Sequence, residues 1–147
     1  MGEINYAADF LDWFAEEAVR NHGDFIQTSD DSHRTVVIRE PIGVCGLITP
    51  WNSPAAMITR KLGPAIAAGC TSVIKAPAET PLTALALAEL TDRVGMPHGV
   101  VNIITADENT ADIGRILITH KDVRKISCTG STRVRQLLAQ QASASLR

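Results

Sequence analysis

Residues 43–75 read GVCGLITPWNSPAAMITRKLGPAIAAGCTSVIK, and this stretch decides the fold. Apolar, β-branched runs at its beginning and its end predict two buried strands. Between them, Asn52 or Ser53 can cap a helix that begins at Pro54, because proline is tolerated at the first helical position. A glycine follows the last turn of that helix. The stretch therefore predicts a strand, a helix and a second strand, which is the building unit of a parallel sheet.

The same alternation continues to the end of the sequence. The later elements are a helix at 81–94, a strand at 99–105, a weaker helix at 110–120, a strand at 123–128 and a helix at 133–144. Strands that are separated by helices indicate parallel pairing through right-handed crossovers, with the strands buried on both faces. The fold class is therefore α/β, an open parallel sheet of the Rossmann type with helices on both faces.

A helix and a hairpin-like segment precede this sheet. Residues 5–20 place aromatic side chains at helical spacing, which predicts a surface helix docked on an apolar partner surface. Residues 23–33 have turn and loop chemistry, and residues 34–49 form two extended runs that Pro41 separates. We divide the chain into an N-terminal helix and loop at 1–34 and an alternating region at 35–147.

The composition excludes several classes of protein. A chain of 147 residues with 45% hydrophobic content suits one domain, and a net charge of −2 gives no reason to expect nucleic acid or an anionic membrane as partner. No apolar run approaches the roughly 20 residues of a membrane span, and the acidic N-terminus is not typical of a targeting signal. We expect a cytoplasmic protein and leave a mitochondrial location open. Three widely spaced cysteines and four scattered histidines predict no disulfide framework and no metal site.

Three groups of residues follow predicted strands, where open α/β sheets bind their ligands. They are residues 49–52, Lys75, and the sequence TGST at 129–132. Glycine in TGST allows close approach of the main chain, and the next helix offers free N–H groups at its positive end, so this segment predicts a phosphate site. The alternatives are that Ser131 is an ordinary helix cap and that Lys75 is a solvated strand end.

Long stretches of the chain resemble the aldehyde dehydrogenase superfamily. The resemblance rests on residues 39–90 together with GVVNIIT and VRKISCTGST, and the phrases ITPWNSPAAMITRK and YAADFLDWFAEEA look most like its succinate-semialdehyde dehydrogenase branch. It implies NAD(P)-dependent oxidation of a small aldehyde, such as succinate semialdehyde, to the carboxylic acid. Family members run to several hundred residues, so the chain corresponds to part of their NAD(P)-binding domain.

The resemblance also implies roles for individual residues. In the family, a cysteine thiolate attacks the aldehyde, an asparagine amide and a main-chain N–H hold the oxyanion, hydride passes to the nicotinamide, and a glutamate activates water. Asn52 matches that asparagine, and its two flanking prolines would preorganise the amide toward the developing charge. The cofactor-binding candidates are Ile48, Thr49, Pro50 and Trp51 along the channel, Lys75 at the adenosine ribose, Gly130 and Ser131 beneath the pyrophosphate, and Val134 nearby.

Some positions depart from the family pattern. Ala78, followed by Glu79, stands where many NAD-preferring members carry a glutamate for the ribose hydroxyls. We keep both residues as cofactor-binding candidates and expect NAD or NADP, with NADP accepted at least as readily, because no carboxylate at that position repels a 2′-phosphate. Arg135 replaces a glycine, where its side chain either crowds the packing or reaches a phosphate. Ala106 and Cys128 replace a common glycine and phenylalanine.

The family's catalytic cysteine and glutamate motifs do not occur in these residues. Cys45, Cys70 and Cys128 have the positions of inert structural thiols, and Cys128 is the least unsuited nucleophile because it ends a strand. We therefore expect a truncated oxidoreductase segment that is inactive alone and needs a catalytic domain. The alternative is a non-catalytic dinucleotide-binding or subunit-interaction module, in a homo- or hetero-oligomer.

Overall fold

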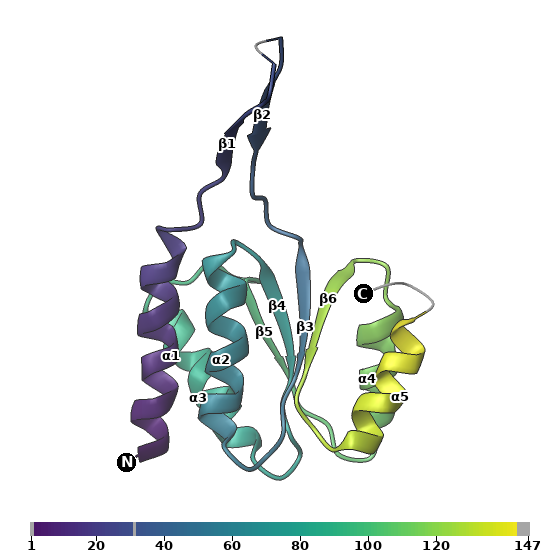
Figure 1. The fold of residues 1–147 in the computed structure, drawn as a ribbon. Helices are drawn as coiled ribbons and strands as arrows, with labels where there is room; N and C mark the ends of the chain where they lie inside the picture. Colours follow the sequence, from purple (N-terminus) through teal and green to yellow (C-terminus); the bar gives the residue numbers. More distant parts are fainter. Residues whose placement is uncertain (1, 31, 144–147) are drawn as a thin grey trace.

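A computed structural model describes residues 2–30 and 32–143 of the chain (Figure 1). In chain order, the elements are α1 (Gly2–Ala18), β1 (Asp24–Gln27), β2 (Arg34–Val37), β3 (Val44–Ile48), α2 (Pro54–Ala67), β4 (Thr71–Lys75), α3 (Pro81–Arg93), β5 (Val101–Ile104), α4 (Thr110–Thr119), β6 (Val123–Cys128) and α5 (Thr132–Ala142). Prolines begin α2 and α3, and glycines with positive φ, Gly69 and Gly95, follow them, as the sequence predicts.

The main sheet has the strand order β5-β4-β3-β6, and all its pairs are parallel. β1 and β2 form a separate antiparallel hairpin that projects away from the body of the molecule (Figure 1). An open parallel sheet, preceded by a helix and a hairpin, confirms the predicted α/β fold class. Residues 24–27, which the sequence analysis assigned to a loop, instead form strand β1, so that part of the prediction is wrong.

Helices cover both faces of the sheet. α2 and α3 pack on β3, β4 and β5, whereas α4 packs on β6 and β3, with α5 outside it (Figure 1). The chain runs outward from β3 to β5 and then returns to the other side of β3, so right-handed crossovers put α4 on the opposite face from α2 and α3. The direction in which the chain adds strands therefore reverses between β3 and β6, although these two strands are paired.

The core lies around the two central strands. Leu47 of β3, Ile58 of α2 and Ile74 of β4 are almost completely buried. The outer strands are less covered, because β5 and β6 contain exposed residues. Burial on both faces, which the sequence predicts for every strand, is thus found for β3 and β4 but not for β5 and β6, which lie at the edges of the described sheet.

α1 docks on α2, as its aromatic spacing predicts. An ideal Cβ on Gly63 would lie 3.0 Å from Cδ2 of Phe14, so glycine lets the two helices approach closely. Phe10 packs beside Ala7, Ala55 and Ala56. The prediction of one docked aromatic face is only partly right, because Trp13 is 64% exposed.

Two properties bear on the classes of function. Among the helices of residues 2–30 and 32–143, none has the length and apolar content that crossing a membrane requires. Within the same described residues, no group of three or more His, Cys, Asp or Glu side chains is arranged to hold a metal ion.

Candidate functional site

The carboxyl ends of the parallel strands lie at one level along one edge of the sheet. Ile48 of β3 is paired with Lys75 of β4 on one side and with Cys128 of β6 on the other, and Lys75 is paired with Ile104 of β5. The main-chain N–H of Thr129 donates to the Ile48 carbonyl at 3.1 Å, so the loop after β6 leaves beside the loop after β3. The structure therefore brings the three predicted groups of residues to the same edge, around the topological switch between β3 and β6.

The loop after β3 carries Asn52. Thr49 is buried, and both its main-chain N–H (3.3 Å) and its Oγ1 (3.4 Å) donate to the carbonyl of Lys75, which anchors the start of the loop. Beyond it, Trp51 is 59% exposed and Asn52 is also exposed. The anchored base and the two prolines thus hold a loop whose tip is accessible to solvent.

Asn52 does not cap α2. The cap residue is Ser53, and its side chain makes no capping hydrogen bond. Instead, Oε1 of Glu3 accepts the main-chain N–H groups of Ala55 (2.9 Å) and Ala56 (3.4 Å). Of the two predicted cap residues, Ser53 stands at the N-cap position, but the side-chain hydrogen bonds come from a carboxylate of α1. Among the described residues, the Asn52 amide has no hydrogen-bond partner.

Lys75 is not a solvated strand end. Its side chain is only 6% exposed. Burial lowers the pKa of Lys75, and the nearby Glu79 carboxylate opposes this shift. Burial of a charged group costs free energy unless it is paired, so the Glu79 carboxylate stabilises the charged form of Lys75.

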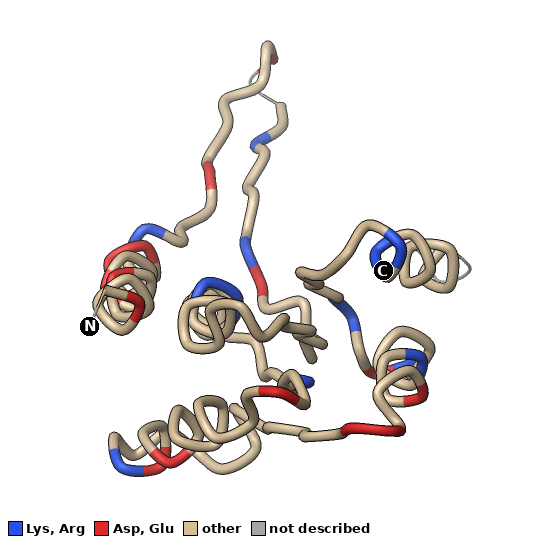
Figure 2. Tube along the Cα trace, turned by 90° about the horizontal axis from the view of Figure 1, so that it is seen from below, with Lys and Arg blue, Asp and Glu red and all other residues tan. Residues whose placement is uncertain are grey.

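The TGST segment, which the sequence predicts as a phosphate site, leads into the first turn of α5. Oγ of Ser131 accepts the main-chain N–H of Val134 at 3.3 Å, so Ser131 is a helix cap. The N–H groups of Thr132 and Arg133 keep no partner within the described chain, as expected for a helix start. The charged residues of α5 are all basic, which adds to the positive end of the helix dipole (Figure 2).

Arg135 does not crowd the packing between strand and helix. It is exposed, and its Nη2 donates to Oγ1 of Thr132 at 3.4 Å, so the guanidinium lies against the first turn of α5. The sequence left open whether the Arg135 side chain crowds the packing or can reach a phosphate. The structure shows an exposed cation beside the predicted phosphate segment.

Lys61 is a residue of this edge that the sequence analysis missed. Its Nζ donates to Oγ1 of Thr129 at 2.5 Å and so joins α2 to the loop after β6. Burial, and to a lesser degree Arg60, lowers the pKa of Lys61. In the sequence, Lys61 lies two turns into the helix that follows Asn52. Lysines at such positions are common on the solvent face of a helix, so nothing in the sequence marked this one as a site residue.

Cys128 lies close to this lysine. Burial raises the pKa of the Cys128 thiol, although Lys61 and Arg135 act in the opposite direction. The structure thus gives this cysteine two cationic neighbours. The thiol is nevertheless less acidic than usual, which does not favour it as a nucleophile.

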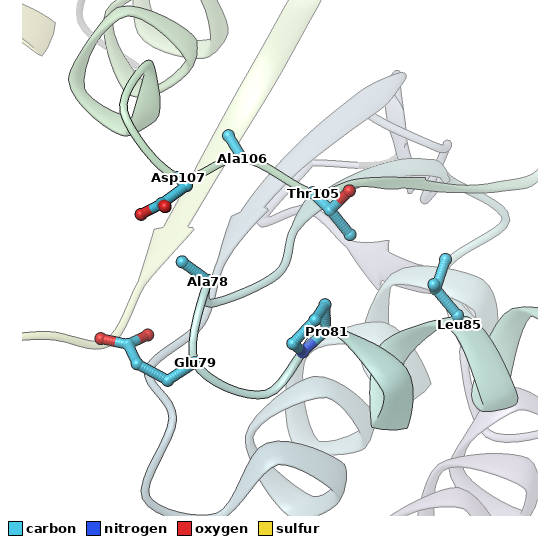
Figure 3. A pocket seen from close by; sticks show the side chains of 7 residues that line it. All are labelled: Ala78, Glu79, Pro81, Leu85, Thr105, Ala106 and Asp107. Atoms are coloured by element: carbon cyan, nitrogen blue, oxygen red, sulfur yellow. The ribbon is translucent and has the colours of Figure 1, made fainter.

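A hollow of about 520 Å³ lies at the ends of β4 and β5 (Figure 3). Its lining residues are Ala78, Glu79, Pro81, Leu85, Thr105, Ala106 and Asp107. Ala78 and Glu79 were predicted cofactor contacts, whereas Pro81, Leu85, Thr105 and Asp107 were missed because the neighbour of β4 could not be identified before the strand order was known.

The site residues thus form two groups along one edge. Ala78 and Glu79 line the hollow at β4 and β5, and Lys75 lies at the end of β4. The second group, at the ends of β3 and β6, consists of Ile48, Thr49, Pro50, Trp51, Asn52, Gly130, Ser131 and Val134. Val134 is 43% exposed on the first turn of α5. An elongated ligand lying along this edge could reach both groups.

Known proteins share this sequence and this fold. The family model described as "Aldehyde dehydrogenase family" matches residues 1–147. The chain is 54% identical over 146 residues to the NADP(+) succinate-semialdehyde dehydrogenase 1 of Schizosaccharomyces pombe, with 99% of this chain and 29% of the relative covered. It is also 54% identical over 142 residues to the NADP(+) succinate-semialdehyde dehydrogenase GabD of Escherichia coli, with 96% of this chain and 29% of that protein covered.

The chain is also similar to a solved structure of a protein with the same name as these relatives. The crystal structure of succinate-semialdehyde dehydrogenase from Burkholderia pseudomallei superimposes with a TM-score of 0.94 at 51% identity, over 99% of this chain and 30% of that one. The chain therefore spans about 29% of the length of these curated relatives. Because the family model matches every residue and the fold agrees, this chain belongs to the aldehyde dehydrogenase family.

Proposed function

We propose that this chain supplies the dinucleotide-binding and oxyanion-binding segments for NAD(P)-dependent oxidation of an aldehyde of the succinate-semialdehyde type to its acid. The observation that carries the proposal is the shared level of the strand ends, which gathers Asn52, Lys75 and the first turn of α5 at one edge. Relatives at about half identity that are named succinate-semialdehyde dehydrogenases support the choice of substrate.

The chemistry of the edge fits a dinucleotide. The unpartnered N–H groups of α5 and its basic residues suit a pyrophosphate, and the hollow at β4 and β5 is large enough for a nucleoside. Ser131 keeps this helix start in place by capping it. When bound, the nicotinamide accepts a hydride from the substrate. We propose that Ile48, Thr49, Pro50, Trp51 and Val134 line its channel, with Gly130 beneath the pyrophosphate.

Asn52 has the role of an oxyanion donor in this proposal. Its exposed amide, which caps nothing, is free to donate an N–H to an oxygen that gains negative charge in the tetrahedral state. Pro50 and Pro54 restrict the loop on both sides, so the donor needs little reorganisation. The nucleophile and the water-activating base would come from residues outside this chain.

The site is proposed to accept NADP as well as NAD. Ala78 puts a methyl group, in place of a carboxylate, beside the ribose end of the hollow, so a 2′-phosphate meets less repulsion there. Relatives whose names include NADP(+) support this reading.

We further propose that residues 1–147 form part of an NAD(P)-binding domain and are inactive alone, since three structural thiols and no catalytic glutamate motif are present. In that case the chain meets its aldehyde only when a catalytic domain completes the site. A cytoplasmic location and association with other subunits through its exposed hairpin belong to the same proposal.

Binding and turnover measured on one preparation test the proposal. Calorimetric titration with NAD⁺ and NADP⁺ is expected to show saturable binding, and Lys75→Met is expected to weaken it about tenfold. Lys121→Met is the matched control, because Lys121 lies before β6 at the opposite edge of the sheet. Absence of saturable binding would reject the proposed function. NAD(P)H formation from succinate semialdehyde by this chain would reject only its inactivity.

A further inference from the structure

The hollow at β4 and β5 has two facing walls made by consecutive loops. The main-chain N–H of Ala76 donates to the carbonyl of Ile104 at 2.9 Å, so the loops after the two strands begin side by side. One wall is Ala78 and Glu79, and the other runs from Thr105 to Asp107 (Figure 3). In the proposed function, on which this inference rests, the hollow holds the adenosine end of a dinucleotide.

Asp107 is held in its wall by the start of α4. The main-chain N–H of Thr110 donates to the carbonyl of Asp107 at 3.3 Å, and Oγ1 of Thr110 donates to the carbonyl of Ala106 at 3.3 Å. These two bonds tie the loop to the first turn of the helix. The main chain that carries Asp107 is therefore held at the wall of the hollow.

The charges in the hollow are unequally compensated. Glu79 interacts electrostatically with the Lys75 ammonium group, which offsets part of its negative charge. Asp107 has no ion-pair partner among residues 2–30 and 32–143. Both carboxylates are exposed at the hollow, and in Figure 3 Ala78 lies between them. Among the described residues, two exposed carboxylates and no cation line the hollow, so it is net negative, and Asp107 is the carboxylate without a cationic neighbour.

The remaining lining is apolar. Pro81 and Leu85 come from the first turns of α3, and Leu85 is 46% exposed although it is a large hydrophobic residue. Such a surface suits the flat face of a base, whereas the sugar and its substituents would meet the polar walls. A ligand that carries additional negative charge at the sugar would be opposed by Asp107.

We propose that Asp107 is a specificity-determining residue of this site, and that its carboxylate weakens binding of adenosine ligands with a 2′-phosphate relative to those with a free 2′-hydroxyl. Ala78 removes one source of repulsion at the ribose, and Asp107 restores part of it from the opposite wall. The preference between NAD and NADP is then set by the loop after β5 as well as by the loop after β4.

The test compares adenosine 5′-monophosphate with adenosine 2′,5′-bisphosphate, because these probes differ only at the 2′ position. Titration calorimetry at low salt is expected to show that Asp107→Asn binds the bisphosphate about threefold to tenfold more tightly than the unmodified chain does. The affinity for the monophosphate is expected to change less than twofold. Asp107→Ser is expected to give the same pattern, and the gain should shrink as salt is added.

Glu108→Gln is the matched control. Glu108 is the next residue of the same loop and is exposed, but it does not line the hollow, so the variant has the same change in net charge. An equal gain in Glu108→Gln, or an unchanged ratio of the two probes in Asp107→Asn, would overturn the inference and leave the proposed function intact. Failure of both probes to bind the unmodified chain would overturn the proposed function, and the inference with it.

Discussion

The carboxylate of Glu3 accepts the main-chain N–H of Ala55 at 2.9 Å, so the first helix supplies the N-terminal cap of the second. The loop that carries Asn52 ends at this cap, because α2 begins at Pro54. The N-terminal helix therefore acts as a structural support for the candidate oxyanion loop, although it lies outside the alternating region.

Replacement of Glu3 by alanine is expected to lower the free energy of unfolding by about 1 kcal/mol, the usual effect of losing a helix cap. Urea unfolding followed by circular dichroism measures this change. Glu16→Ala is the control, since Glu16 is an exposed carboxylate of the same helix. Equal losses in the two variants would show that the cap contributes nothing.

Gly46 of β3 is crowded by side chains of β6 and α4. An ideal Cβ at this position would lie 2.7 Å from Cδ1 of Ile126 and 3.3 Å from Cγ1 of Val123, both on β6, and 3.6 Å from Cβ of Leu117 on α4. Gly46→Ala is therefore expected to cost about 1–3 kcal/mol through overpacking.

Gly114→Ala is expected to stabilise the protein, in contrast to Gly46→Ala. Gly114 lies inside α4, and a Cβ there would meet only Cδ2 of Leu138, at 3.8 Å. The change should raise the free energy of unfolding by up to about 1 kcal/mol, because alanine favours helix over glycine. Urea midpoints compare the two variants, and a Gly46→Ala protein as stable as the unmodified chain would contradict the crowding of Gly46 by side chains of β6 and α4.

The buried thiol of Cys45 is expected to make the free energy of unfolding fall as the pH rises above 9. Burial raises its pKa from 9.0 to about 11, with a further contribution from the neighbouring Cys70 thiol. Below pH 9 the thiol is protonated in both states, whereas between pH 9 and 11 only the unfolded chain loses the proton, so stability falls as pH rises.

Denaturation at several pH values across this window, under reducing conditions, measures the slope for the unmodified chain and for Cys45→Ala. The variant is expected to be less stable at neutral pH, because it leaves a small cavity, but to lose less stability as pH rises. Parallel pH profiles for the two proteins would contradict the prediction.

Asn52 is expected to contribute little to the fold. Asn52→Ala should change the free energy of unfolding by less than about 0.5 kcal/mol, because the side chain is exposed and caps nothing. Thr49→Val is the positive control in the same loop and should cost about 1 kcal/mol, since it removes a buried hydrogen bond to Lys75. If Asn52→Ala lost as much unfolding free energy as Thr49→Val, Asn52 would have a structural role.

Local chemistry explains which elements could be predicted from the sequence. Proline at the start of α2 and α3 and glycine after them mark those helices. The position of β6, between the helix at 110–120 and the TGST segment, was predicted with the bounds Val123–Cys128 that the structure shows. β1 escaped prediction because its sequence, DFIQ, places two apolar residues side by side between polar ones and so shows no alternation of apolar and polar residues.

The site was only partly predictable because it depends on contacts between distant segments. Lys75 and the TGST segment could be recognised from their positions after strands. The cap from Glu3, the bond between Lys61 and Thr129, and the wall that contains Asp107 each require the strand order or the docking of α1. Local patterns carry no information on which strands become neighbours.

The place of β6 in the sheet matters during synthesis on the ribosome. β3, β4 and β5 can pair in the order in which they are translated, because each is adjacent to the next in the sheet. The opposite edge of β3 stays open until Cys128 has been made, since β6 is the strand that covers it. A nascent chain that pauses before Val123 therefore displays an unpaired apolar strand, and chaperone engagement should be strongest in that interval.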